Sequence, residues 1–201
     1  MIRLIENHST AADRRALETM FVDRKRQFVD FFEWDVPVVD GRYEMDQFDT
    51  ARAVYIIAVD DTGAHEASMR MLPSMHPHLL DTLFSHLCPT GVPIGETIWE
   101  STRLCLPNRH GAARRLELRN ALISAMVDFA LARGIERITG VIPDGFRKQV
   151  LAMGWRAEPL GPVAPIRGGP IGAFAIDINR DTPDRLSWTG VYRPAGDRIA
   201  A

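Results

Sequence analysis

The sequence predicts an α/β (α+β) fold in which helices pack on a mixed, mostly antiparallel sheet. Two long segments carry apolar residues at three- and four-residue spacing, as amphipathic helices do. Several short apolar runs are bounded by turn residues, which is typical of buried strands. Because the order of these segments mixes hairpins with helical crossovers, we expect helices layered on one sheet.

The N-terminal elements begin with a strand over residues 1–5 and a helix over residues 11–33. A strand over residues 52–59 follows, then a hairpin turn at 60–63 and a returning strand over 65–72. Within the helix expected over residues 11–33, a set of mostly apolar residues recurs at three- and four-residue spacing, so these residues define one face. That face consists of Leu17, Met20, Phe21, Arg24, Phe28 and Phe31.

The later elements follow the same patterns, and the long helix among them stops at Gly134. Its buried stripe is expected to be Leu118, Leu122, Met126 and Phe129. In order, the expected elements are a short helix over 79–87, a strand over 97–106, a helix over 108–133, a strand over 138–142, a helix over 144–153 and a strand over 172–178. We therefore expect a single domain over residues 1–180, and a polar, loosely held tail over residues 181–201.

Composition and charge narrow the function classes. The chain has 201 residues, of which 46% are hydrophobic and 25% charged, which excludes a disordered chain. Its 24 basic and 26 acidic residues nearly cancel, which argues against bulk electrostatic binding of nucleic acid. The apolar runs are too short to span a bilayer, and residues 1–6 lack a signal peptide's apolar stretch, so we expect a cytoplasmic protein. Cys88 and Cys105 lack metal-ligand spacing, so we expect buried small hydrophobes and no metal site.

Charged residues within strongly apolar sequence are the candidates for chemistry. An unpaired buried charge costs several kcal/mol, so these side chains either neutralise one another or bind a ligand. Aromatic residues flank them, which favours a ligand with a carboxylate, an amine, a soft cation and a flat base. The charged residues are Arg24, Asp46, Asp49, Arg70, Glu100 and Arg103, and the aromatic residues are Phe28, Trp34, Phe48, Phe84 and Trp99.

Taken in order, these residues resemble the motifs of a known family. The chain reads Arg24-x3-Phe28-x5-Trp34, Asp46-x2-Asp49, Arg70-x-Leu72-Pro73, Phe84, Trp99-Glu100-x-Thr102-Arg103 and Gly154-Trp155. The set is similar to the acyl-homoserine lactone synthases, the bacterial autoinducer synthases, and it covers residues from about 20 to 156. One departure is Thr102, where many members carry serine, but the hydroxyl is retained.

The resemblance implies a three-layer α-β-α sandwich like that of the GCN5-type N-acetyltransferases. It implies an acyltransferase for quorum sensing with two substrates, S-adenosylmethionine and an acyl thioester of acyl carrier protein or coenzyme A. The amine is acylated, the methionine carboxylate then closes the lactone, and methylthioadenosine leaves. It implies no cofactor, because S-adenosylmethionine is a substrate. From the charge balance and the short apolar runs we expect no nucleic-acid or membrane partner. The oligomeric state is left open.

The catalytic candidates lie on one strand. An α-amino group is largely protonated at neutral pH, so a base is needed, and Glu100 is our candidate. In a regular strand Glu100 and Thr102 share one face while Arg103 points to the other. If all three serve one site, we expect a bulge or splay there, which would also free a backbone N–H for the thioester oxyanion.

The remaining candidates bind substrate. Arg24 and Arg103 are our candidates for holding the carboxylate of S-adenosylmethionine. Phe28 and Trp34 would cover its nucleoside. Asp46 and Asp49 would orient the arginines or bind the substrate amine. The full set is Arg24, Phe28, Trp34, Asp46, Asp49, Arg70 and Arg103. An acyl pocket is assigned to Phe84, Trp99, Leu122, Met126, Gly140, Ile142 and Met153, although these positions are equally compatible with plain core.

Two further features bear on the acyl donor. Relatives selective for 3-oxo chains carry threonine where Gly140 stands here, which argues against a 3-oxo preference. Arg147 and Lys148, with Arg114, Arg115 and Arg119, are candidates to dock acyl carrier protein, or are simply solvated. The chain length and the choice of carrier are left open.

Two alternatives remain. One is an N-acyltransferase that uses acyl-coenzyme A and another amine. The segment over residues 108–113 keeps the glycine and small residue of the [QR]-x-x-G-x-[GA] phosphate loop but starts with Asn108. The other is a non-catalytic homologue, against which the retained charged residues argue.

Overall fold

The computed structural model describes residues 1–6, 10–166 and 168–194. Its contacts divide the chain into two compact units, which are described separately below. The first unit comprises Met1–Arg70, Arg103–Ala125 and the described residues from 193 onward, and the second comprises Met71–Thr102 and Met126–Tyr192. The expectation of a single domain over residues 1–180 therefore stays a prediction.

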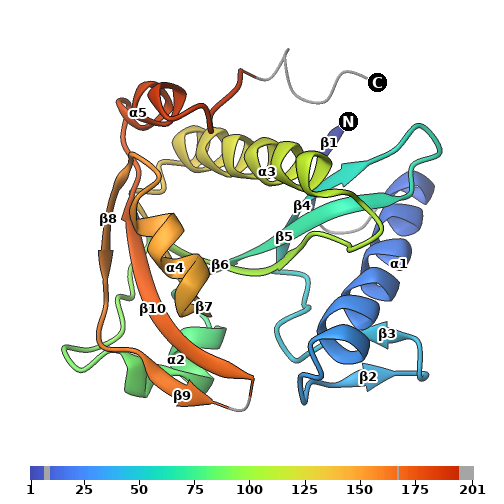
Figure 1. Ribbon diagram of the computed structural model, residues 1–201, viewed down its shortest axis with the longest axis horizontal. Coiled ribbons are helices and arrows are strands. Elements are labelled where there is room, and N and C mark those ends of the chain that lie inside the picture. The colour runs from blue at the N-terminus through green and yellow to red at the C-terminus, as the bar shows by residue number, and fades with distance from the viewer. Residues whose placement is uncertain (7–9, 167, 195–201) are drawn as a thin grey trace. The chain divides into compact units, whose positions relative to one another are not determined.

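The first unit places a helix beside the N-terminal strands. Strand β1 (Ile2–Ile5) pairs antiparallel with β4 (Val54–Val59), and β5 (His65–Pro73) follows in the strand order. Helix α1 (Ala11–Arg24) begins at a capping box, in which Thr10 and Asp13 exchange side-chain and backbone hydrogen bonds. It packs on β3 (Tyr43–Glu44), which forms a small hairpin with β2 (Val38–Val39), as Figure 1 shows.

The helix expected over residues 11–33 changes type partway along. After α1 the chain continues as a π-helix, η1 (Lys25–Phe31). Phe28 is buried as expected, but Phe31 is 62% exposed, so its place on the apolar face is wrong. The physical reason is that a π-helix has more residues per turn, which rotates Phe31 away from the α-helical stripe.

The second unit holds most of the mixed sheet. Its strand order is β6-β7-β10-β8, with β9 paired to β10. Strand β6 pairs parallel with β7, whereas β10 pairs antiparallel with β7, β8 and β9. The strands are β6 (Ile98–Cys105), β7 (Arg137–Pro143), β8 (Arg156–Pro159), β9 (Ala164–Ile166) and β10 (Gly169–Asp177). The mixed, mostly antiparallel sheet predicted from the sequence is confirmed.

Helices cover this sheet. Helix α4 (Asp144–Leu151) packs on β7, β8 and β10, and it is visible beside β10 in Figure 1. The short helices are α2 (Leu79–Leu83), η2 (Ser85–Leu87) and α5 (Thr182–Trp188). The long helix α3 (Ala112–Arg133) runs from the first unit into the second. Its predicted stripe of Leu118, Leu122, Met126 and Phe129 is buried.

The tail differs from the expectation. Residues from 182 form α5, in which Leu186 is fully buried, and Val191 beyond it is 5% exposed. The Tyr192 hydroxyl donates to Asp128 at 2.7 Å. A loosely held tail is therefore wrong for residues 182–192, because apolar burial and this hydrogen bond fasten them. Residues 195–201 lie outside the described residues.

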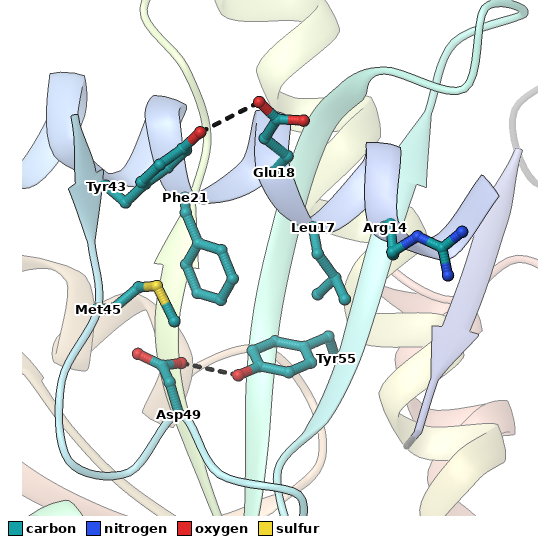
Figure 2. A pocket seen from close by; sticks show the side chains of 8 residues that line it. All are labelled: Arg14, Leu17, Glu18, Phe21, Tyr43, Met45, Asp49 and Tyr55. Atoms are coloured by element: carbon teal, nitrogen blue, oxygen red, sulfur yellow. Dashed lines mark hydrogen bonds between the residues drawn. The ribbon is translucent and has the colours of Figure 1, made fainter. Parts of the chain in front are cut away.

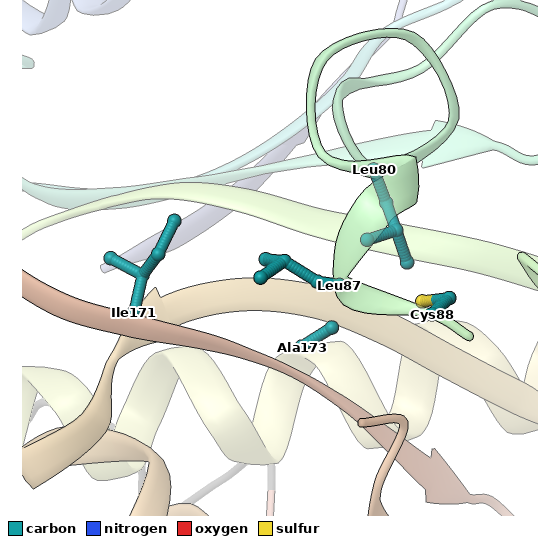
Figure 3. Packing of buried hydrophobic residues seen from close by; sticks show 5 residues of the cluster. All are labelled: Leu80, Leu87, Cys88, Ile171 and Ala173. Atoms are coloured by element: carbon teal, nitrogen blue, oxygen red, sulfur yellow. The ribbon is translucent and has the colours of Figure 1, made fainter. Parts of the chain in front are cut away.

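An apolar cluster that includes residues of β10 forms part of the core of the second unit. Its buried members, drawn in Figure 3, are Leu80, Leu87, Cys88, Ile171 and Ala173. Phe84 and Val141 pack against it. Cys88 and Cys105 are buried free thiols, as expected, and burial raises the pKa of each. None of the helices in the described part of the chain is long and apolar enough to cross a membrane.

Candidate functional site

Three arginines and three acids of the first unit form a closed ring of alternating charge. Arg24 donates from Nη1 and Nη2 to the two carboxylate oxygens of Asp49, both at 2.9 Å. Its Nε donates to Glu44 Oε2 at 2.5 Å. Arg24 at the C-terminal end of α1 thus joins β3 to the loop that carries Asp49.

The other two arginines complete the ring. Arg70 on β5 lies 2.6 Å from Asp46 Oδ1 and 2.8 Å from Asp49 Oδ1. Arg103 on β6 donates from Nε to Glu44 at 3.0 Å and from Nη2 to Asp46 at 2.6 Å. Each charge therefore contacts two groups of opposite sign.

Burial and pairing set the electrostatics of this ring. All six side chains are at most 7% exposed, so an unpaired charge here would be costly. Burial alone would raise the pKa of Asp49, but Arg24 and Arg70 hold it well below its usual range. The neighbouring acids raise the pKa values of Arg24 and Arg70 although burial opposes this. All three groups are therefore charged at neutral pH.

Sequence reasoning placed Glu100 among the paired acids and missed Glu44. Glu44 is fully buried and bridges Arg24 and Arg103. A usable signal was its position two residues before Asp46, because alternate residues of an extended segment share a face. Tyr55 was also missed, and its hydroxyl donates to Asp49 at 2.8 Å. The mutual neutralisation that the sequence left open is thus what the ring shows.

Aromatic rings lie against these charges. The Phe28 and Trp34 rings stack in parallel, with centroids 5.0 Å apart and planes 5° apart. The Arg103 guanidinium lies 5.8 Å from the Phe28 centroid, and that of Arg70 lies 5.8 Å from the Phe48 centroid. The π-helix η1 carries Phe28, and π-helical turns occur often at functional sites. The first unit therefore combines flat apolar faces with oriented charge.

Strand β6 is irregular where the sequence predicts it. Arg103 has a φ of +52°, a left-handed backbone conformation that is rare in a strand. Glu100 and Thr102 are buried in the regular alternation, but the next buried residue is Cys105. The shift by one residue is what a bulge produces, and the expected irregularity is confirmed.

Glu100 is held by backbone amides. The N–H groups of Leu79 and Leu80, at the start of α2, donate to its two carboxylate oxygens at 2.8 Å each. The residue is fully buried. These two amide donors orient the carboxylate of Glu100.

The residues predicted to line an acyl pocket are mostly packed in the core. Leu122, Met126 and Met153 are at most 6% exposed, while Phe84 and Ile142 are partly buried. The Trp99 and Phe129 rings pack edge to face at 5.4 Å. A Cβ at Gly140 would lie 2.8 Å from the Phe174 ring and 2.9 Å from the Ser101 carbonyl oxygen. Strand register thus requires glycine there, and the acyl assignment stays a prediction.

One of the residues proposed to dock acyl carrier protein is not on the surface. Arg147 is 9% exposed, and its Nη1 donates to the carbonyl oxygens of Gly161 and Ala173. That expectation is therefore wrong for Arg147, because its guanidinium holds backbone inside the second unit. Lys148 remains exposed and pairs with Asp144 at 2.8 Å.

A cavity of about 330 Å³ lies between α1, β3 and β4 in the first unit. Figure 2 shows Phe21 and Leu17 on one side and Tyr55, bonded to Asp49, on the other. Of the predicted site residues only Asp49 lines it, and the ring already engages that carboxylate. Within the described residues, no group of three or more His, Cys, Asp or Glu side chains is arranged to hold a metal ion.

Comparison of the fold first defines a class. The structure is similar to an acyl-CoA N-acyltransferase from Pseudomonas aeruginosa, with a TM-score of 0.54 over 87% of this chain and 98% of that one, at 15% identity. It is more similar to BjaI, a CoA-dependent acyl-homoserine lactone synthase solved with MTA, with a TM-score of 0.84 over 99% of this chain and 95% of that one, at 26% identity. The fold is that of the N-acyltransferases.

Sequence comparison then defines the family. The autoinducer synthase family model matches residues 8–186. An acyl-homoserine-lactone synthase of Ralstonia nicotianae is 36% identical over 83% of this chain and 84% of its own length. That of Rhizobium etli is 32% identical over 82% of this chain and 79% of its own. This chain belongs to the autoinducer synthase family, as its motifs predict.

Proposed function

We propose that this chain synthesises an N-acyl-L-homoserine lactone, a quorum-sensing signal, from S-adenosylmethionine and an acyl thioester. The observation that carries the proposal is the charge ring with Arg103 at the Phe28–Trp34 stack. A neutral, oriented ring suits a substrate that itself carries a carboxylate, an ammonium and a sulfonium. The cytoplasmic location expected from the sequence is part of this proposal.

Arg103 is the best placed arginine to receive the substrate carboxylate. Its contacts with Glu44 and Asp46 use Nε and Nη2, and none of the described carboxylates pairs with its Nη1. Arg24, by contrast, uses all three guanidinium nitrogens within the ring. We therefore assign the carboxylate to Arg103 Nη1 and give Arg24, Asp49 and Arg70 the task of holding the ring.

Phe28 and Trp34 provide the flat surface for the nucleoside and its sulfonium. Trp34 is only partly buried, so its ring can contact a substrate. A sulfonium is a soft cation that aromatic faces attract, and an adenine base stacks on them. The same pair thus serves both parts of the proposed substrate.

Acyl transfer needs a proton acceptor, for which we propose Glu100. The substrate ammonium loses one proton to become the nucleophile, and its nitrogen attacks the thioester carbonyl carbon. When the C–S bond breaks, the thiolate takes up a proton and the amide nitrogen loses one. The two amide contacts orient the Glu100 carboxylate, and a carboxylate can accept the first proton directly or through a water.

The irregularity of β6 bears on the oxyanion of this step. The left-handed backbone of Arg103 directly follows Thr102, and such an irregularity can turn a backbone N–H away from the strand ladder. We assign the Thr102 segment to stabilising the developing charge on the thioester oxygen. Lactone closure then needs mainly positioning, since the carboxylate displaces an activated sulfonium leaving group and methylthioadenosine departs.

The acyl chain is assigned to the second unit. Phe84 packs on the cluster of Leu80, Leu87 and Ile171, which offers an apolar, adaptable surface (Figure 3). Both acyl carrier protein and coenzyme A remain candidate carriers. One similar structure is BjaI with SAM and isopentyl-CoA, at 27% identity and a TM-score of 0.82 over 99% of this chain and 95% of that one. Coenzyme A thioesters are therefore tested from the start.

The test is a product assay. The protein is incubated with S-adenosylmethionine and a panel of acyl carrier protein and coenzyme A thioesters, and products are analysed by mass spectrometry. We expect equal amounts of methylthioadenosine and an acyl-homoserine lactone with at least one donor. Absence of methylthioadenosine with every donor would overturn the proposal. Coenzyme A release onto another amine would instead favour the N-acyltransferase alternative.

A further inference from the structure

A second buried polar network of the first unit lies outside the charge ring. His65 Nδ1 lies 2.8 Å from Asp23 Oδ2, and His65 Nε2 lies 3.0 Å from Ser68 Oγ. All three residues are at most 4% exposed. The Asp23–His65–Ser68 chain therefore links the last turn of α1 to strand β5.

The protonation states of Asp23 and His65 determine the direction of the hydrogen bonds in the Asp23–His65–Ser68 network. Burial alone would raise the pKa of Asp23, but hydrogen bonds from His65 and Arg109 lower it. Burial lowers the pKa of His65 although Asp23 opposes this. Asp23 is thus ionised and His65 neutral at pH 7, so Nδ1–H donates to Asp23 and Nε2 accepts from the Ser68 hydroxyl.

Arg109 balances the charge of Asp23. Its Nη1 lies 2.7 Å from Asp23 Oδ2, and its Nη2 donates to the backbone carbonyl of His65. Arg109 belongs to the segment that precedes α3, so three separate parts of the first unit meet at this chain. The buried carboxylate is neutralised without drawing on the arginines of the ring.

The Asp23–His65–Ser68 network and the charge ring hold neighbouring residues of α1. Asp23 and Arg24 are consecutive on α1, so their side chains point about 100° apart. Arg24 is fastened to the ring and Asp23 to His65, and two anchors in different directions fix the rotation of the helix. On β5, Ser68 and Arg70 are two residues apart and share a face, so both anchors rest on one strand.

The anchored turn is the one that changes type. α1 ends at Arg24 and η1 begins at Lys25, so the π-helix that carries Phe28 starts beside the two anchors. A π-helical segment is rare and occurs frequently at functional sites. A shift in helix rotation here would move both Arg24 and Phe28.

We propose that His65 is a positioning residue, which sets the rotation of the α1–η1 junction and thereby the placement of Arg24 and Phe28 for S-adenosylmethionine. This inference rests on the proposed function. The role belongs to the Nδ1–H contact with Asp23, because that contact fastens the helix. Asparagine supplies an N–H donor near the position of Nδ1, whereas leucine fills similar volume without a donor.

The experiment compares His65→Asn and His65→Leu with the unchanged protein. For His65→Leu we expect the KM for S-adenosylmethionine to rise about 10- to 100-fold, with the KM for the acyl thioester unchanged. His65→Asn should restore most of the loss. Equal rises in both KM values, or no rise with leucine, would overturn the proposal.

Hydrogen exchange gives a readout that does not need activity. We expect His65→Leu to accelerate amide exchange in residues 20–31 and to leave residues 54–59 of β4 unchanged. Uniformly faster exchange would mean a general loss of stability and would overturn the proposal. If the unchanged protein makes no lactone, the proposed function fails, and the exchange pattern still decides whether His65 fixes the junction.

A matched pair of serine variants keeps the proposal testable if His65→Leu does not fold. Ser68→Ala removes a member of the chain, and Ser124→Ala removes a buried hydroxyl that donates to Asn120 on α3 instead. Ser68→Ala should raise the KM for S-adenosylmethionine, by less than His65→Leu, and Ser124→Ala should not. Indistinguishable effects of the two substitutions would count against a positioning role.

Discussion

The carboxylate of Glu44 and the guanidinium of Arg103 lie 59 positions apart in the sequence and 3.0 Å apart in the structure. Glu44 is fully buried and also accepts from Arg24, so one carboxylate bridges two arginines of the ring. Loss of Glu44 therefore leaves three buried cations with two acids.

We expect Glu44→Ala to destabilise the protein by about 3–5 kcal/mol, the usual cost of breaking a buried ion pair from one side. Glu44→Gln keeps an acceptor and should cost less. Urea unfolding measures both. The exposed Glu96 offers a control, since Glu96→Ala should leave the unfolding midpoint unchanged. A Glu44→Ala variant as stable as the unchanged protein would show that the ion pairs of Glu44 do not contribute to the free energy of unfolding.

Arg103 is expected to act on substrate affinity. Lysine keeps the positive charge, but its single ammonium cannot bind Glu44 and Asp46 and also donate to the substrate carboxylate in the fixed geometry of a guanidinium. We expect Arg103→Lys to lower kcat/KM for S-adenosylmethionine by about 10- to 100-fold, or about 1.4–2.7 kcal/mol. Calorimetric titration with S-adenosylmethionine checks the affinity directly. Unchanged affinity in Arg103→Lys would remove the carboxylate assignment.

Glu100 is expected to act on turnover. Glu100→Gln keeps the shape of the side chain and removes the basic carboxylate, so turnover should fall at least about 100-fold. Affinity for S-adenosylmethionine should persist, which separates this variant from those of the ring. A rate equal to that of the unchanged protein would take Glu100 out of the proton-transfer role.

Acid should destabilise the protein in two windows. The pKa of His65 is lowered from its ordinary 6.5, so the unfolded chain binds the extra proton and stability falls as pH drops below about 6.5. The pKa of Asp49 is depressed below its ordinary 3.8, so its stabilisation is present above that pH and is lost as pH falls through the folded value. Thermal unfolding between pH 8 and pH 3 measures the first loss and the onset of the second. His65→Asn should flatten the upper window, and a slope unchanged by that substitution would refute its assignment.

Threonine at position 140 should be poorly tolerated. Its Cβ would lie 2.8 Å from the Phe174 ring and 2.9 Å from the Ser101 carbonyl oxygen, and backbone cannot move aside easily. We expect Gly140→Thr to cost about 1–3 kcal/mol, as overpacking does. Adding Phe174→Leu should recover part of it, which urea unfolding would show. A stable Gly140→Thr single variant would mean that β6 and β7 can separate here.

Much of the fold could be predicted from local patterns. The α3 stripe of Leu118 and Leu122 is confirmed, and the strand expected over residues 52–59 is present as Val54–Val59. Both segments carry strong periodic or apolar signals. Strands β2 and β3 were missed because two-residue strands have no period to detect. Helix α5 was missed because its single fully buried apolar residue, Leu186, is surrounded by polar sequence.

The motifs alone determined which family this chain belongs to, because residue type and spacing are properties of the sequence. Only the tertiary structure decided the partners. Glu44, rather than Glu100, closes the ring, and Glu100 binds amides of α2 instead. The reason is that pairing between buried charges depends on distances of a few ångströms between segments far apart in sequence, and burial makes each choice of partner costly to change.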